Sequence, residues 1–142
     1  MIMNYLLSEI ARIVGGEHRG CDLRVKEVAT DSRGVMSSDD MVFVAINGKN
    51  HDGHNYIPQM VVRGVRAFIT ERPVDVAEGA GVVVVDSAIV ALQRLAAHHR
   101  RNFKGRVVAI TGSNGKTIVK EWASRSMPDT VRSFASPKSY NS

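Results

Sequence analysis

Residues 107–117, VVAITGSNGKT, constrain the fold more than any other segment of the chain. The apolar start predicts a buried strand, and the glycine-rich end predicts a tight turn that leads into a helix. Gly112 and Gly115 permit backbone angles that a side chain would forbid. Successive N–H groups of such a turn can converge on phosphate oxygens, helped by the N-terminus of the following helix. This pattern therefore predicts a phosphate-binding loop.

Two side chains of the loop would carry its chemistry. Lys116 supplies positive charge for the outer phosphates of a nucleotide, and Thr117 offers a hydroxyl to Mg²⁺. The match to G-x-x-x-x-G-K-[ST] is incomplete, because Ile110 stands where the first glycine falls. The alternative is an ordinary glycine-rich turn with a surface lysine, which the flanking strand and helix disfavour. The loop residues predicted to hold the nucleotide are Thr111, Gly112, Ser113, Asn114, Gly115, Lys116 and Thr117.

Strand and helix patterns alternate along the rest of the chain. Apolar spacing predicts helices over 4–14 and near 87–101. A shorter helix is predicted over 55–64, since Pro58 would fall in its first turn, where the missing N–H costs nothing. Apolar runs predict strands at 24–29, 41–46, 65–70, 81–85, 106–110 and 130–134. A last helix is predicted to begin near Thr117 and to end before Pro128.

These patterns predict an α/β fold in two parts. Residues 1–85 would form a small N-terminal α/β domain with a mostly buried sheet, and residues 86–102 a linker helix. Residues 103–142 would be the first strand, phosphate loop and helix of a parallel-sheet ATPase domain. Such a domain needs further parallel strands and cover on both sheet faces. We therefore expect a truncated chain that is not catalytically active alone.

Two polar clusters flank the apolar strand predicted at 41–46. They are Asp31-Ser32-Arg33 before the strand and the loop 48–54, GKNHDGH, after it. Arg33 and Lys49 could pair with a diphosphate, while Ser32 and backbone amides donate hydrogen bonds. From the residues alone, an ordinary polar turn is the favoured interpretation of both clusters. His51, Asp52 and His54 of this loop could be imagined as metal ligands, but their spacing does not provide a convincing set of three.

Composition narrows the classes of function. The net charge is +5, but lysines and arginines are scattered and aromatic residues make up 6%, which disfavours nucleic-acid binding. No apolar run approaches the ~20 residues of a membrane helix. The first residues lack the basic and apolar regions of a secretory signal. One cysteine, Cys21, cannot form an internal disulfide, which agrees with a reducing compartment.

Two motifs in this order resemble the Mur ligases, the cytoplasmic enzymes that build the peptidoglycan precursor. TGSNGKT after VVAI is similar to their ATP loop. The segments similar in order and spacing to their N-terminal, uridine-nucleotide-binding domain are Thr30–Arg33, Met41–Ala45, Gly48 and Asp52–Ile57. Ser113 and residues 116–121 are most similar to the member that adds D-alanyl-D-alanine. Residues 52–71 also resemble the member that adds a diamino acid.

The resemblance implies an ATP-dependent amide ligase in the cytoplasm, with ATP and Mg²⁺ as cofactors. ATP would phosphorylate a carboxylate of UDP-N-acetylmuramoyl-tripeptide, and the amine of D-Ala-D-Ala would attack the acyl phosphate. Lys116 and Thr117 would act in catalysis through positioning and charge neutralisation, with Thr117 on Mg²⁺. The residues implied to hold the UDP part are Asp31, Ser32, Arg33, Asn47, Gly48 and His54. Neither nucleic acid nor membrane insertion is implied.

Three alternatives remain open at this point. One is the related ligase that adds a diamino acid. Another is a folate polyglutamate ligase, which would share the phosphate loop, although the motifs between 30 and 57 argue against it. The third is a non-catalytic module that binds a nucleotide sugar. Binding of uridine nucleotides near 31–33 and 47–54 would discriminate these possibilities from a folate enzyme.

Overall fold

A computed structural model describes residues 3–34, 40–48 and 51–136. The chain forms two compact units, Met1–Phe103 and Lys104–Ser142, which we describe one at a time. The helices of the first unit are α1 (Leu7–Val14), α2 (Ile57–Val62) and α3 (Ala88–Asn102), with 3₁₀ turns η1 (Ser32–Gly34) and η2 (Gly53–Tyr56). Its strands are β1 (Tyr5–Leu6), β2 (Glu17–Gly20), β3 (Arg24–Val25), β4 (Glu27–Ala29), β5 (Met41–Val44), β6 (Ala67–Thr70) and β7 (Gly81–Val84).

A five-stranded sheet organises the first unit, in the order β2-β7-β6-β5-β4. The four strands from β4 to β7 are parallel, and β2 pairs antiparallel with β7. A separate antiparallel ladder joins β1 to β3. The predicted α/β class is therefore confirmed. The carboxyl ends of β4 to β7 share one edge of the sheet, where parallel sheets commonly bind ligands.

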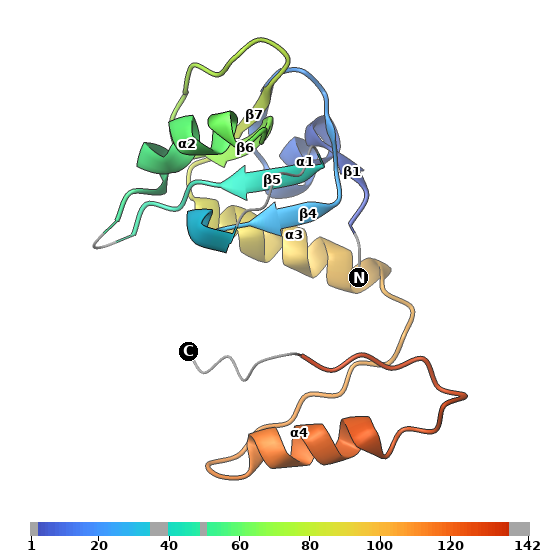
Figure 1. Ribbon diagram of the computed structural model, residues 1–142. Helices are drawn as coiled ribbons and strands as arrows, with labels where there is room; N and C mark the ends of the chain where they lie inside the picture. Colours follow the sequence, from blue (N-terminus) through green and yellow to red (C-terminus); the bar gives the residue numbers. More distant parts are fainter. Residues whose placement is uncertain (1–2, 35–39, 49–50, 137–142) are drawn as a thin grey trace. The chain divides into compact units, whose positions relative to one another are not determined.

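Helices cover both faces of this sheet (Figure 1). Val42 and Val44 of β5 face α1 and α3, whereas Phe43 faces α2, because successive side chains of a strand point to opposite faces. Both sets are buried, which explains why β5, β6 and β7 are nearly continuous apolar runs. Pro58 lies in the first turn of α2, as predicted.

The edge strand β2 was not predicted from the sequence. Its residues, EHRG, include no apolar side chain, and most of them are exposed. The strand forms through backbone hydrogen bonds with β7, opposite Val84 to Gly81. An edge strand that pairs by its backbone leaves no apolar alternation, so hydropathy patterns cannot reveal it.

The second unit contains α4 (Lys116–Arg125), which begins after Gly115 and ends before Pro128, as predicted. The strands predicted at 106–110 and 130–134 are wrong, because neither segment pairs with another strand. Val108 is 78% exposed and Phe134 85% exposed. A strand needs hydrogen-bonded neighbours, and the described residues of this unit provide none.

None of the helices in the described part of the chain has the length and apolar composition that a membrane span requires.

Candidate functional site

An open cleft of about 730 Å³ lies at the carboxyl ends of β4 and β5. The loop after β4 contributes residues 30–33, and β5 with its following loop contributes Phe43, Ile46, His51 and Gly53. Tyr56, Gln59 and Arg63 form the side built by η2 and α2. The cleft thus occupies the part of a parallel sheet where ligands commonly bind.

The predicted residues Asp31, Ser32 and Arg33 lie together in the wall of this cleft. Arg33 binds Asp31 through two side-chain donors, with Nη2–Oδ2 at 2.7 Å and Nε–Oδ1 at 3.0 Å. These side-chain bonds, followed by the Arg33 backbone N–H, lower the pKa of Asp31 to about 2. The Arg33 side chain stays 88% exposed, so its charge is presented at the mouth of the cleft.

Three further cleft residues were not identified from the sequence. Tyr56, Gln59 and Arg63 are spaced at i, i+3 and i+7, which places them along one face of η2 and α2. Arg63 Nη1 donates to the Ser32 carbonyl oxygen at 2.5 Å and thereby ties α2 to η1. The helical spacing of these three residues can be found in the sequence. Without knowledge of the cleft, however, the same spacing indicates only an ordinary polar face of a helix.

The loop after β5 folds back on itself. Asn47 bridges Asp52, the Gly48 N–H donates to the His51 carbonyl at 2.9 Å, and the Gly53 N–H donates to the Ile46 carbonyl at 2.8 Å. This fold brings His51 and Gly53 to the cleft, whereas Asn47 and Gly48 shape the loop without lining the cleft. Lys49 of the predicted diphosphate site lies outside the described residues.

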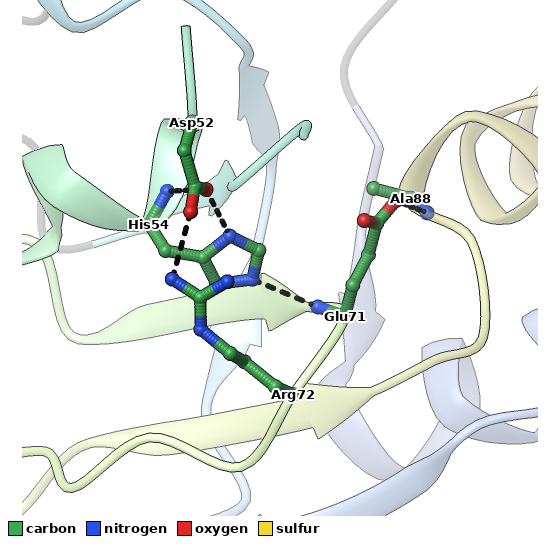
Figure 2. Close-up of polar contacts among 5 residues, drawn as sticks. All are labelled: Asp52, His54, Glu71, Arg72 and Ala88. Atoms are coloured by element: carbon green, nitrogen blue, oxygen red, sulfur yellow. Dashed lines mark hydrogen bonds and ion pairs between the residues drawn. The ribbon is translucent and has the colours of Figure 1, made fainter. Parts of the chain in front are cut away.

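His54, also predicted to hold the uridine nucleotide, does not line the cleft. Its side chain is 3% exposed, and its Nδ1 lies 2.6 Å from Asp52 Oδ1 (Figure 2). Its Nε2 accepts the Glu71 backbone N–H at 3.0 Å, and Glu71 Oε1 accepts the Ala88 N–H at 2.8 Å. Arg72 donates to Asp52 Oδ2 at 2.8 Å. We call Asp52, His54, Glu71, Arg72 and Ala88 the His54 network.

The charge of Asp52 is stabilised by its neighbours in the His54 network. The His54 backbone N–H makes the largest contribution, followed by the Arg72 and His54 side chains, and together they hold the pKa of Asp52 well below its ordinary range. Asp52 is also the N-cap of η2 through its bond from the His54 N–H, at 2.9 Å. Asp52 is therefore a carboxylate that fixes local backbone.

The phosphate loop in the second unit has the backbone that its glycines allow. Gly112 and Gly115 have φ of +152° and +78°, and a Cβ built on Gly115 would meet nothing within 4 Å. Lys116 Nζ donates to the Gly112 carbonyl at 2.5 Å, so the ammonium group lies over the loop. Thr117 follows in the first turn of α4. An open glycine turn, a lysine and a helix N-terminus fit a phosphate group.

The described residues contain no group of three or more His, Cys, Asp or Glu side chains that could hold a metal ion. The predicted Mg²⁺ ligand within this chain is therefore a single hydroxyl, that of Thr117. Bound phosphates supply most Mg²⁺ ligands in nucleotide sites, so one protein hydroxyl fits that role.

Comparison with known proteins identifies relatives of this chain. Residues 24–103, which include the cleft, match the model described as "Mur ligase family, catalytic domain". The UDP-N-acetylmuramoyl-tripeptide--D-alanyl-D-alanine ligase of Synechocystis sp. is 39% identical over 101 residues, covering 70% of this chain and 22% of the relative. The ligase of the same name from Escherichia coli (strain K12) is 35% identical over 120 residues, covering 84% of this chain and 26% of the relative.

Solved structures give the same result. A crystal structure of MurF from Acinetobacter baumannii matches with a TM-score of 0.75 and 30% identity, over 89% of this chain and 29% of that one. MurF from Thermotoga maritima in complex with ADP matches with a TM-score of 0.54 and 37% identity, over 67% of this chain and 21% of that one. The chain spans about a quarter of the relatives' length. Fold and sequence thus agree, and the chain belongs to the Mur ligase family.

Proposed function

We propose that this chain provides the uridine-nucleotide site and the ATP loop of a ligase that adds D-Ala-D-Ala to UDP-N-acetylmuramoyl-tripeptide. The observation that carries the proposal is the cleft at the carboxyl ends of β4 and β5, with Asp31, Ser32 and Arg33 in its wall. Relatives that bear the name of this activity match 70% and 84% of the chain, which supports the choice of substrate.

In this proposal residues 1–85 bind the UDP part of the substrate, residues 86–102 form the connecting helix, and residues 103–142 begin the ATP-binding domain. Arg33 pairs with diphosphate oxygens, for which its planar guanidinium is well suited. Asp31 holds that guanidinium beside the cleft, and Ser32 donates to the ligand. Asn47 and Gly48 set the shape of the loop that closes the site.

The nucleotide is held by the loop 111–117. Lys116 neutralises the outer phosphates after leaving the Gly112 carbonyl, and Thr117 binds Mg²⁺. When bound, ATP would supply the phosphoryl group for activation of the tripeptide carboxylate, with ADP as the leaving group, and attack by the amine of D-Ala-D-Ala would form the amide and release phosphate. A Thermotoga maritima MurF has been solved in complex with ADP, which supports ATP as the nucleotide. The reaction takes place in the cytoplasm.

The proposal is tested by titrating the ¹⁵N-labelled chain with UDP. Amide signals of residues 31–33 and 46–53 are expected to shift, and Arg33→Ala is expected to raise the dissociation constant about tenfold, the loss of about 1.4 kcal/mol. Arg19→Ala is the matched control, because Arg19 forms an exposed pair with Glu17 at the same spacing, on the distant edge strand β2. Absence of shifts in the cleft would refute the site.

A second titration separates the ligase from a module that binds only a nucleotide sugar. ATP with Mg²⁺ is expected to shift the amides of residues 111–117, and Lys116→Ala is expected to abolish that effect while leaving UDP binding unchanged. A chain that binds UDP but not ATP would favour the non-catalytic module. Amide formation by this chain alone would contradict our expectation that the chain is inactive by itself.

A further inference from the structure

The hydrogen bonds of the His54 network select one form of the His54 ring. A backbone N–H can only donate, so Nε2, which lies 3.0 Å from the Glu71 nitrogen, must accept and carry no proton. Nδ1 then carries the proton and donates to Asp52 at 2.6 Å. Both ring nitrogens are therefore engaged within the protein, in the neutral Nδ1–H tautomer.

This ring joins three parts of the first unit that are distant in sequence. On one side, Asp52 caps η2 and bridges Asn47 in the loop after β5. On the other side, Glu71 follows β6, and its carboxylate accepts the first N–H of α3, from Ala88. Figure 2 shows the chain of contacts that runs from Asp52 through His54 and Glu71 to Ala88.

The loop held in this way forms part of the cleft wall. Ile46, His51 and Gly53 line the cleft, and Gly53 comes directly before the buried ring of His54. Backbone packing leaves the loop little room, because a Cβ on Gly53 would lie 2.7 Å from the Ile46 nitrogen. A displacement of His54 would consequently displace residues that face the ligand.

We propose that His54 is a positioning residue of the cleft, which fixes residues 46–48 and 51–53 on the end of β6 and does not touch the ligand. This inference rests on the proposed function only in taking a uridine nucleotide as the ligand. It reassigns a residue that the motif alone places among the substrate contacts.

The first test measures the tautomer in the intact chain. A long-range ¹H–¹⁵N spectrum of the ¹⁵N-histidine-labelled protein at about pH 7 is expected to show His54 with a protonated Nδ1 and an unprotonated Nε2. Saturating UDP is expected to leave that pattern unchanged. An Nε2–H tautomer, a doubly protonated ring or a change of tautomer with UDP would overturn the inference.

The second test compares affinities for uridine, uridine monophosphate and UDP. His54→Ala is expected to weaken all three by the same factor, about tenfold, since a displaced loop affects the whole cleft. His54→Gln, whose amide oxygen can accept the Glu71 N–H, is expected to recover part of that loss. A loss confined to the phosphate-bearing ligands would show direct contact and overturn the inference, as would unchanged affinity or a glutamine no better than alanine.

Two further variants test whether the loss of affinity in His54→Ala results only from unfolding of the protein. Arg72 is 53% exposed and does not line the cleft, so Arg72→Ala should fold and should weaken the three ligands equally, by about threefold. His18→Ala removes a histidine from the edge strand β2 and should leave all three affinities unchanged. An unaffected Arg72→Ala would contradict the proposed role of Asp52 in holding the loop.

The inference remains testable if the wild-type chain binds no uridine nucleotide, a result that would refute the proposed function. In that case, amide hydrogen exchange tests whether His54 positions the loop. Exchange at Glu71 is expected to accelerate in His54→Ala, and the amide signals of His51 and Gly53 are expected to shift. Unchanged exchange and signals would show that His54 does not position the loop.

Discussion

At the residue scale, two arginine–carboxylate pairs of equal spacing lie in different surroundings. Arg19 binds Glu17 at 3.0 Å on the edge strand β2, and Arg33 binds Asp31 at 2.7 Å in the wall of the cleft. Both pairs are exposed, and such pairs contribute little to stability. Only the Arg33–Asp31 pair lies where a ligand in the cleft could contact it. The Arg19–Glu17 pair therefore serves as the control.

Gly53, which lies between Asp52 and His54, is packed so closely that a larger side chain would not fit. A Cβ would lie 2.7 Å from the Ile46 nitrogen and 3.0 Å from the Ala45 carbonyl carbon, both of which are backbone atoms that cannot move aside alone. Gly53→Ala is therefore expected to cost about 1–3 kcal/mol, as overpacking does. The melting temperature of the first unit should fall by at least ~4 °C.

Gly48→Ala is the control for that change, because among the described residues its Cβ would approach only the His51 carbonyl oxygen, at 3.4 Å. It should leave the melting temperature within about a degree of the wild type, as surface substitutions usually do. Equal melting temperatures for the two variants would contradict the close packing of Gly53 against Ala45 and Ile46.

The sequence predicted the place of a candidate residue correctly where the residues of the motif also lie on the surface of the cleft. Asp31, Ser32 and Arg33, which the motif predicts to bind the ligand, line the cleft. His54, predicted with them, does not line it, because the DGH sequence does not reveal that the ring turns inward to a backbone N–H 17 residues away. Arg63 was missed for a related reason, since its contact with Ser32 spans 31 residues and leaves no local pattern.

At the scale of elements, η2 depends on a charged cap. Asp52 accepts the His54 N–H and the Arg72 guanidinium, which hold its pKa below the ordinary value of 3.8. A carboxyl group whose pKa is lowered on folding stabilises the native state above its unfolded pKa and loses that effect as the pH falls toward its folded pKa.

Asp52→Asn retains a side-chain oxygen but removes this charge. We expect it to lower the melting temperature by the same amount from about pH 7 to about pH 5, where the wild-type carboxylate is ionised in both states. Below about pH 4 the difference should shrink, as the advantage of the wild type disappears. Melting curves of both proteins across this range measure the effect, and a difference independent of pH would exclude a charge contribution.

Elements were predictable in proportion to how much apolar surface they bury. The buried strands β5, β6 and β7 and the helices α1 and α3 follow their apolar patterns. The strand β2 was missed because it pairs through its backbone and has no apolar residue. The strand predicted at 106–110 was wrong for the opposite reason: its apolar residues have no neighbouring strand to pair with in the described residues.

At the scale of the whole molecule, the two units differ in how much they bury. Every buried apolar side chain among the described residues belongs to Met1–Phe103. The second unit exposes Trp122 by 67% and Phe134 by 85%, and its one helix has ten residues. Isolated helices of that length are marginal in water, so the stability of the chain should come from the first unit.

This difference predicts that a chain ending at Phe103 keeps its stability and its uridine-nucleotide site. The sheet, both apolar clusters and the cleft are all built from residues before 104. We expect residues 1–103 to melt within about two degrees of the full chain, since only surface would be removed, and to bind UDP with the same affinity. In the full chain, amide exchange should be slowest in β5, β6 and β7 and fastest beyond 104. A markedly lower melting temperature for residues 1–103 would show that the second unit stabilises the first.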